Sequence, residues 1–236
     1  MTIDRRRFLT VSAATLSSAL LAACDGDPAR AHRLLAFAER KNELLERGLF
    51  RHTSMNVVPA SARLAGPSFP RYFVSKQVPI WDTAAHGVWR LEVSGAVRRP
   101  LSLSLDELSR LPRISQTVDH FCVEGWNARA TWTGVRVSEL ARLAQITPDA
   151  QYVDFGGFDD GYHESWDLDS AMHPQTLVAY GMDGRMLGPD HGAPARVHSP
   201  VKLGYKNTKY LTRVVFLPAR NGGYWSDQGY EWYGGT

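Results

Sequence analysis

The sequence predicts a mixed α+β domain, because short alternating strands are interspersed with brief helices. Apolar and polar residues alternate over 89–94 and again over 101–105, the period of two that is typical of half-buried strands. Residues 138–144 are predicted to form a short helix. Many short strands with brief helices favour an α+β domain over a doubly wound parallel sheet.

The other elements follow from local signals along the chain. Leucines recur among charges over 29–49 before a terminating glycine, which predicts a helix. Prolines within 52–70 indicate a linker or an extended wrapping segment. Ser104 and Glu107 match a capping box for a short helix through Leu108. Further strands are predicted at 114–121, 151–155, 176–182 and 211–217, with turns over 95–100 and 182–185.

Length and composition exclude several classes of protein. The 236 residues suit one large domain or two small ones, and 44% hydrophobic with 22% charged residues is an ordinary globular balance. The formal charge of +3 does not indicate a polyelectrolyte, so we expect no nucleic-acid partner. Two cysteines, Cys24 and Cys122, exclude a disulfide-dense scaffold and a Cys-rich zinc or iron–sulfur site. A single disulfide between them stays open.

The N-terminus is predicted to be an export signal over 1–23. Three arginines at 5–7 precede an uncharged run over 8–23, which is shorter than the roughly 20 residues of a membrane span. The arginines followed by Phe8-Leu9 resemble a Tat signal. The end of the run, Leu21-Ala22-Ala23-Cys24, resembles a lipobox, in which Cys24 would be lipidated and could not pair with Cys122. The alternative is a plain signal peptide with an incidental Cys24.

Three segments are therefore expected. They are a Tat-type lipoprotein signal peptide over 1–23, an N-terminal helix and linker over 24–70, and the main domain over 71–236. The mature protein would be lipid-anchored at the periplasmic side of the bacterial inner membrane, with Asp25 resembling a retention signal for that membrane.

Charge is unevenly distributed along the main domain. Acids dominate between Asp149 and Asp190, where Arg185 is the one base, whereas the segment 191–226 carries lysines and arginines and no acid. The basic segment suits a small anionic ligand such as a phosphate. Alternatively, it is a solvated basic face that complements the acidic segment.

Cys122 carries the remaining chemistry. The sequence lacks the G-x-S-x-G, phosphate-loop, H-E-x-x-H and C-x-x-C-H motifs. A lone cysteine among apolar residues can be an inert core thiol. It can instead be a nucleophile paired with His120, or a thiolate ligand to a metal whose other ligands come from an organic cofactor.

Several motifs together resemble the molybdenum enzymes of the sulfite-oxidase fold, in the bacterial branch near the periplasmic methionine-sulfoxide reductase catalytic subunit. The resemblance runs from about Arg71 to Leu217. Its motifs are Phe121-Cys122-Val123-Glu124-Gly125-Trp126, Trp132-Thr133-Gly134, Ala171-Met172-His173-Pro174, Leu177-Val178-Ala179-Tyr180, His191-Gly192-Ala193-Pro194-Ala195-Arg196 and 200–209. It implies a sulfite-oxidase-type molybdopterin-binding fold over 71–236 and one Mo-molybdopterin cofactor.

The resemblance also implies roles for individual residues. Cys122 matches the thiolate ligand of molybdenum and is the catalytic residue. The other matched residues would contact the pterin or its phosphate: Tyr72, Phe73, Gly157, His191, Arg196, Asn207, Thr208 and Lys209. Candidates for the substrate pocket are Trp126, Arg129, Tyr162, His163 and Trp225, and the aromatic end of the chain could pack over a site.

The implied reaction is a two-electron oxygen-atom transfer on a small S- or N-oxide or an oxidisable sulfur compound. Electrons would be exchanged with a cytochrome or a quinone-linked membrane haem protein. Val123-Glu124-Gly125-Trp126 departs from the basic stretch of sulfite oxidases proper, and Glu124 would disfavour an anion such as sulfite. Gly157 and His191 align where the methionine-sulfoxide reductases have Thr and Asn, which leaves that substrate open. Sulfite oxidase proper and a non-catalytic cofactor-binding lipoprotein are the alternatives.

Overall fold

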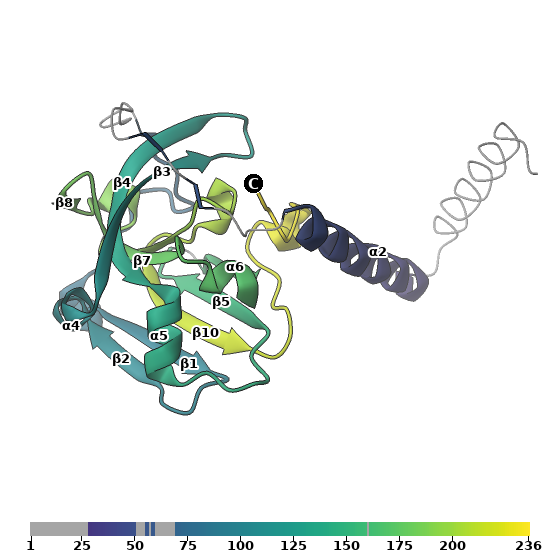
Figure 1. Ribbon diagram of the computed structural model, residues 1–236, viewed down its shortest axis with the longest axis horizontal. Helices are drawn as coiled ribbons and strands as arrows, with labels where there is room; N and C mark the ends of the chain where they lie inside the picture. The colour runs from purple at the N-terminus through teal and green to yellow at the C-terminus, as the bar shows by residue number, and fades with distance from the viewer. Residues whose placement is uncertain (1–27, 51–54, 57, 60–68, 160) are drawn as a thin grey trace, which may run out of the picture. The chain divides into compact units, whose positions relative to one another are not determined.

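The computed structural model describes residues 28–50, 55–56, 58–59, 69–159 and 161–236 (Figure 1). The predicted signal over 1–23, the predicted lipidation site Cys24 and much of the predicted linker lie outside these residues. Helix α2 (Pro28–Leu49) confirms the helix predicted at 29–49 and contains an Arg47–Glu43 ion pair of 2.8 Å. No helix among the described residues combines the length and apolar character needed to cross a membrane.

A second compact unit begins at Phe50 and contains two sheets. The first sheet has the strand order β2-β1-β10-β5-β6, in which only the β1–β10 pair is parallel. Leu91 and Val93 are fully buried while Arg90 and Glu92 face solvent, which confirms the predicted alternation. The strands are β1 (Arg90–Gly95), β2 (Leu101–Ser104), β5 (Tyr152–Gly157), β6 (His163–Asp167) and β10 (Leu211–Leu217).

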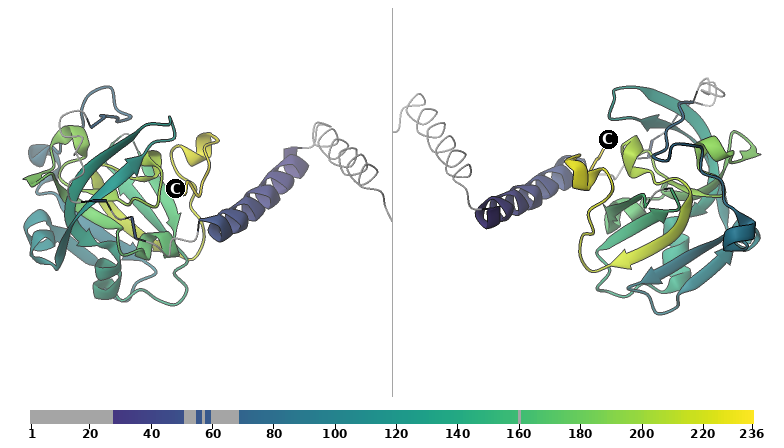
Figure 2. Two further views of the ribbon diagram at one scale, coloured as in Figure 1. Left: turned by 45° about the horizontal axis from the view of Figure 1, so that its top comes forward. Right: turned by 180° about the vertical axis from the view of Figure 1, so that it is seen from behind.

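The second sheet is antiparallel, in the order β3-β4-β7-β8, with β9 also paired to β7. Strands β3 and β4 form a long curved ribbon in every view (Figures 1 and 2), and Cys122 lies in the loop that joins them. Asp183 and Gly184 both have positive φ, as the predicted hairpin turn between β7 and β8 requires. The strands are β3 (Arg113–Phe121), β4 (Asn127–Arg136), β7 (Leu177–Met182), β8 (Arg185–Met186) and β9 (Arg196–His198).

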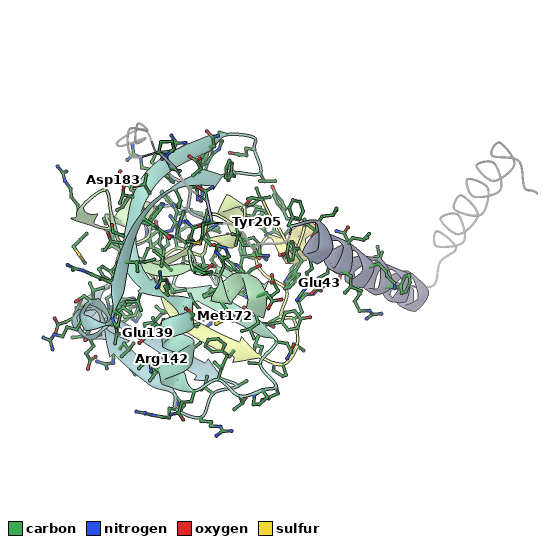
Figure 3. All side chains as sticks on the ribbon, in the orientation of Figure 1. Glu43, Glu139, Arg142, Met172, Asp183 and Tyr205 are labelled. Carbon is green, nitrogen blue, oxygen red and sulfur yellow. The ribbon has the colours of Figure 1, made fainter. Side chains whose placement is uncertain are left out.

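The helices of this unit are short. Ser104 and Glu107 form the predicted capping box at the start of α4. Helix α5 buries Leu140 and Ala144 and carries the Glu139–Arg142 ion pair on its other side (Figure 3). The helices are α3 (Thr83–His86), α4 (Leu105–Arg110), α5 (Val137–Ala144), α6 (Leu168–Met172) and the 3₁₀ turns η2 (Pro189–His191), η3 (Gly204–Lys206) and η4 (Ser226–Gln228). Short helices on one mixed and one antiparallel sheet confirm the α+β class.

Two apolar cores hold the sheets together. The larger core joins α5 to the first sheet and to inward-facing residues of the second, such as Val135 and Val178. The smaller core is built on the second sheet around Trp132 and includes Phe69, which is 3% exposed. Asn56 also exchanges two hydrogen bonds with the Gln175 side chain. These described residues of the predicted linker therefore pack on the domain, as a wrapping segment would.

Candidate functional site

A cavity of about 470 Å³ opens beside the smaller core, and we call it the pocket. Five stretches of chain line it, within 69–74, 120–126, 159–162, 196–209 and 224–230. These stretches are far apart in sequence, and the turn at the end of the β3–β4 ribbon brings Cys122 to them. A cavity of this size suits a small-molecule ligand or cofactor.

Cys122 is held by a tight turn. Its backbone N–H donates to the Trp126 carbonyl (2.9 Å), and Gly125, whose φ is +87°, donates its N–H back to the Cys122 carbonyl (3.0 Å). The free thiol is half-buried, and burial raises its pKa; the Glu124 carboxylate adds to this rise, while the backbone N–H groups of Glu124 and Val123 oppose it. Glu124 Oε2 lies 3.9 Å from Cys122 Sγ and accepts a hydrogen bond from Trp126 Nε1 (3.0 Å). A carboxylate therefore stands beside the thiol at the pocket.

The geometry does not support a thiol-hydrolase pair of Cys122 and His120. The His120 ring is buried and packs against His198, with 3.3 Å between Nδ1 and Nε2. Burial lowers the pKa of His120 to about 3, so the ring is neutral. A nucleophilic thiol needs a lowered pKa and a nearby base, whereas this thiol has a raised pKa. The described hydrogen bonds include none between the two side chains.

Two cations of the basic segment reach the pocket without a carboxylate partner among the described residues. Arg196 is 1% exposed and donates to the carbonyls of His191 (3.2 Å) and Asn207 (3.1 Å). The Lys209 ammonium donates hydrogen bonds to the carbonyls of Tyr72 (2.5 Å) and Asp190 (3.2 Å). Burial lowers the pKa of Arg196 to about 10 and that of Lys209 to about 7. Buried positive charge of this kind favours an anionic ligand.

Two other lysines of the basic segment form ion pairs with carboxylates of the acidic segment instead. Lys202 pairs with Asp167 (2.9 Å) and Lys206 with Glu164 (2.5 Å), and the side chains of both pairs are completely buried or nearly so. Each of the two interpretations of the basic segment therefore accounts for part of it. Arg196 and Lys209 face the pocket, while Lys202 and Lys206 neutralise acids.

Most residues predicted for the site line the pocket. These are Tyr72, Phe73, Cys122, Trp126, Tyr162, Arg196, Asn207, Lys209 and Trp225. The side chain of Asn207 is committed to its own loop, because it accepts from the Ser199 N–H (2.7 Å) and donates to the carbonyls of Lys202 and Leu203. It shapes the backbone around Lys209.

Five predicted residues do not line the pocket. Gly157 packs under Lys209, where an added Cβ would lie 2.5 Å from the Lys209 carbonyl oxygen. His191 Nδ1 and Thr208 Oγ1 are buried polar atoms without a hydrogen-bond partner among the described residues. Arg129 forms a bidentate pair with Asp119 across the β3–β4 ribbon, and His163 is paired with Asp154 (2.7 Å), whose hydrogen bond raises the pKa of His163.

Some pocket residues were not singled out from the sequence. Asp159 is buried and accepts hydrogen bonds from the N–H groups of Val74 and Ser75, which holds the segment with Tyr72 and Phe73 at the pocket. Tyr205, labelled in Figure 3, and Tyr224 and Tyr230 also line it. The aromatic composition of the chain end is the signal for them, and this end lines the pocket, as the expectation that it could pack over a site requires.

The donor set fits an anionic metal cofactor. The thiol of Cys122 is a soft ligand, and the unpartnered atoms of His191 and Thr208 lie close in sequence to Arg196 and Lys209. Cys122 thus offers a metal ligand and the two cations offer positive charge at the pocket. Two unpartnered polar atoms lie on the same stretch of chain. No cluster of three His, Cys, Asp or Glu side chains that could hold a metal ion occurs in the part of the chain that the structure describes.

Comparisons with known proteins agree with this fit. Residues 76–225 match the family described as "Oxidoreductase molybdopterin binding domain". YedZ1 of Azospira oryzae, provisionally named as a protein-methionine-sulfoxide reductase subunit, is 37% identical over 98% of this chain and 88% of its own length. The protein-methionine-sulfoxide reductase catalytic subunit MsrP of Campylobacter jejuni is 30% identical over 62% of this chain and 54% of its own.

A solved structure supports the fold. The sulfane dehydrogenase SoxCD of Paracoccus pantotrophus superposes with a TM-score of 0.53 at 23% identity, covering 56% of this chain and 39% of that one. The family match covers most of the main domain, and the YedZ1 match extends along nearly the whole chain. The chain therefore belongs to the molybdopterin-binding oxidoreductases of the sulfite-oxidase fold.

Proposed function

We propose that this chain is the catalytic subunit of a membrane-tethered reductase that removes the oxygen atom from a sulfoxide. Methionine sulfoxide is the first candidate substrate. The observation that carries the proposal is the pocket, which is lined by Cys122, by the buried Arg196 and by the partly buried Lys209, two cations that have no carboxylate partner among the described residues. The names of the two curated relatives support the substrate.

Cys122 would bind molybdenum through its thiolate, and Arg196 and Lys209 would neutralise the anionic part of the pterin cofactor. Tyr72 and Phe73, which line the pocket, would flank it, while the buried unpartnered atoms of His191 and Thr208 lie behind the pocket lining. When bound, the cofactor supplies two-electron oxygen-atom transfer.

The surroundings of Cys122 favour a neutral substrate over an anion. The Glu124 carboxylate stands 3.9 Å from Cys122 Sγ and would repel sulfite. A sulfoxide is neutral and dipolar, and aromatic rings such as Trp126 and Trp225 are suitable neighbours for the sulfur and its methyl group. In the net reaction a sulfoxide takes up two electrons and two protons and becomes a thioether and water.

The remaining expectations complete the proposal. Export by the Tat route and lipidation of Cys24 would tether the mature chain to the periplasmic side of the inner membrane. The electrons would then come from a cytochrome or a quinone-linked membrane haem protein. YedZ1 and MsrP are both named as subunits, which agrees with a partner.

The test is elemental analysis followed by turnover. Protein matured in a host that makes molybdopterin should contain one molybdenum per chain, and Cys122→Ser and Cys122→Ala should lose it while staying folded. Reduced viologen should then support reduction of methionine sulfoxide by the wild type. Full molybdenum in both variants would refute the ligand role of Cys122. A loaded wild type that turns over neither sulfoxides, N-oxides nor sulfite would favour the non-catalytic alternative, and turnover of sulfite alone would favour sulfite oxidase proper.

A further inference from the structure

The last part of the chain forms one side of the pocket. After β10 the chain returns beside β6, where Glu164 and Gly223 form an antiparallel bridge. We call the three pocket-lining rings of this part, Tyr224, Trp225 and Tyr230, the aromatic wall. Trp225 contacts both tyrosine rings, with centroids 5.3 and 5.0 Å apart. The wall thus behaves as one packed group.

A single buried carboxylate holds the base of this wall. Glu164 is completely buried on β6, and its two oxygens accept from the Trp225 N–H (2.9 Å), the Ser226 hydroxyl (2.9 Å) and the Lys206 ammonium (2.5 Å). Lys206 is also completely buried and donates to the Ser226 hydroxyl (3.3 Å). The Glu164–Lys206 ion pair is therefore hydrogen-bonded to Trp225 and Ser226, which belong to the segment that carries the wall.

The backbone approaches this carboxylate closely. A Cβ built on Gly223 would lie 2.2 Å from Glu164 Oε2, so a larger residue there would displace either the carboxylate or the segment. Neighbouring backbone bonds, from Tyr224 N–H to the His163 carbonyl (2.8 Å) and from Ser165 N–H to the Gly222 carbonyl (3.2 Å), set the register. The position of the wall is thus fixed from β6.

We propose that Glu164, paired with Lys206, is a positioning residue that fixes the aromatic wall and thereby sets the affinity of the pocket for a sulfoxide side chain. The inference rests on the proposed function for its substrate. The aromatic wall at 224–230 lies on a different segment of the pocket from Cys122, Arg196 and Lys209, whereas Lys206 belongs to the same stretch as the two cations. Moving the wall should therefore change substrate binding more than cofactor binding or the chemical step.

The physical reason is the cost of a buried unpaired charge. Glu164→Gln keeps the size of the side chain but removes the one carboxylate that is in direct contact with the Lys206 ammonium among the described residues, in a site closed to water. The ammonium must then draw in water or rearrange, and either response loosens the segment at Trp225 and Ser226. Replacing both partners, in Glu164→Gln/Lys206→Met, removes the unpaired charge and should restore part of the order.

The chain offers a matched control in Asp167 and Lys202. That pair is equally buried and lies at the end of the same strand, but Lys202 donates to the Tyr233 carbonyl, which is outside the pocket lining. Asp167→Asn should therefore lower the stability of the protein, also through the lost cap of α6, but it leaves the hydrogen bonds of Glu164 to Trp225 and Ser226 in place and should affect the wall much less. Ser226→Ala is a milder change that removes one hydrogen bond to Glu164 and no charge.

The experiment combines kinetics with proteolysis on molybdenum-loaded full-length protein. Using methionine sulfoxide and reduced viologen, we expect Glu164→Gln to raise KM roughly tenfold with kcat within about twofold. Ser226→Ala should raise KM by about threefold, and Asp167→Asn should leave it unchanged. Molybdenum per chain should equal that of the wild type throughout. Chymotrypsin, which cleaves after aromatic residues, should cut Glu164→Gln within 224–230 much faster than the wild type or Asp167→Asn.

The outcomes separate the inference from the proposed function. An unchanged KM in Glu164→Gln, or an equal rise in KM in Asp167→Asn, would overturn the positioning role. The clearest refutation is an unchanged KM in a Glu164→Gln protein that chymotrypsin cleaves rapidly within 224–230. The wall would then be loosened with no effect on substrate binding. If the loaded wild type does not reduce sulfoxides, the proposed function fails and the affinity claim fails with it. Chymotrypsin still decides then whether Glu164 holds the wall. If Glu164→Gln does not fold, Ser226→Ala and the double variant decide.

Discussion

Lys209 should make the stability of the cofactor-free protein rise with pH. Its pKa is about 7 in the folded chain, against 10.5 for an ordinary lysine. Between these values the unfolded chain holds a proton that the folded chain has released, so the free energy of unfolding increases as the pH rises. Below pH 7 the penalty for burying the ammonium is complete, and above about pH 10.5 it is gone.

The two pKa values give the size of the effect. At about 1.4 kcal/mol per unit, the penalty is about 4 kcal/mol at pH 7 and about 2 kcal/mol at pH 9. Because the Lys209 ammonium keeps two carbonyl partners and some contact with water, we halve the difference. The wild type should then gain about 1 kcal/mol between pH 7 and pH 9 through this residue.

The assay is urea unfolding of cofactor-free protein at several pH values between 7 and 9 and constant ionic strength. Lys209→Met should lack this increase, while the exposed residue Lys76, changed in Lys76→Met, should retain it. Binding of the anionic cofactor should raise the pKa of Lys209 and flatten the wild-type profile. The reasoning fails if Lys209→Met follows the pH profile of the wild type, because the penalty would then lie elsewhere.

Three further substitutions test the site. Glu124→Gln should strengthen inhibition by sulfite about fivefold at low salt and less at high salt, since removing the carboxylate beside Cys122 removes a repulsion that salt screens; an unchanged inhibition constant would contradict the role given to this charge. Gly157→Ala should lower molybdenum per chain, because the added Cβ would meet the Lys209 carbonyl at 2.5 Å; normal loading would show that the backbone there yields. Arg129→Ala should leave kcat/KM for sulfoxide unchanged, because Arg129 pairs with Asp119 outside the pocket lining; a large loss would return Arg129 to the substrate site.

Local sequence patterns were sufficient to predict those elements in which a residue's environment depends on its neighbours in sequence. The alternation around Leu91 predicted β1, and Ser104 with Glu107 predicted the cap of α4. Strand β4 gave no such signal, because alanines at 128 and 130 occupy its buried face and alanine has little strand preference. Strand β6 was missed because buried polar residues such as Glu164 and Ser165 hide its period.

The sequence by itself determined the α+β class, most of the elements, and a set of motifs in which Cys122, Arg196 and Lys209 stand out. Only the tertiary structure decided how the charges are used. Lys202 and Lys206 look the same as Lys209 along the chain, yet two of them meet buried acids on β6 and the third faces the pocket. Arg129 and His163 likewise turn to carboxylates beside them. Pairing between charges depends on distance in space, and residues separated by 35 or 42 positions, as in Lys202–Asp167 and Lys206–Glu164, come together only through the packing of strands.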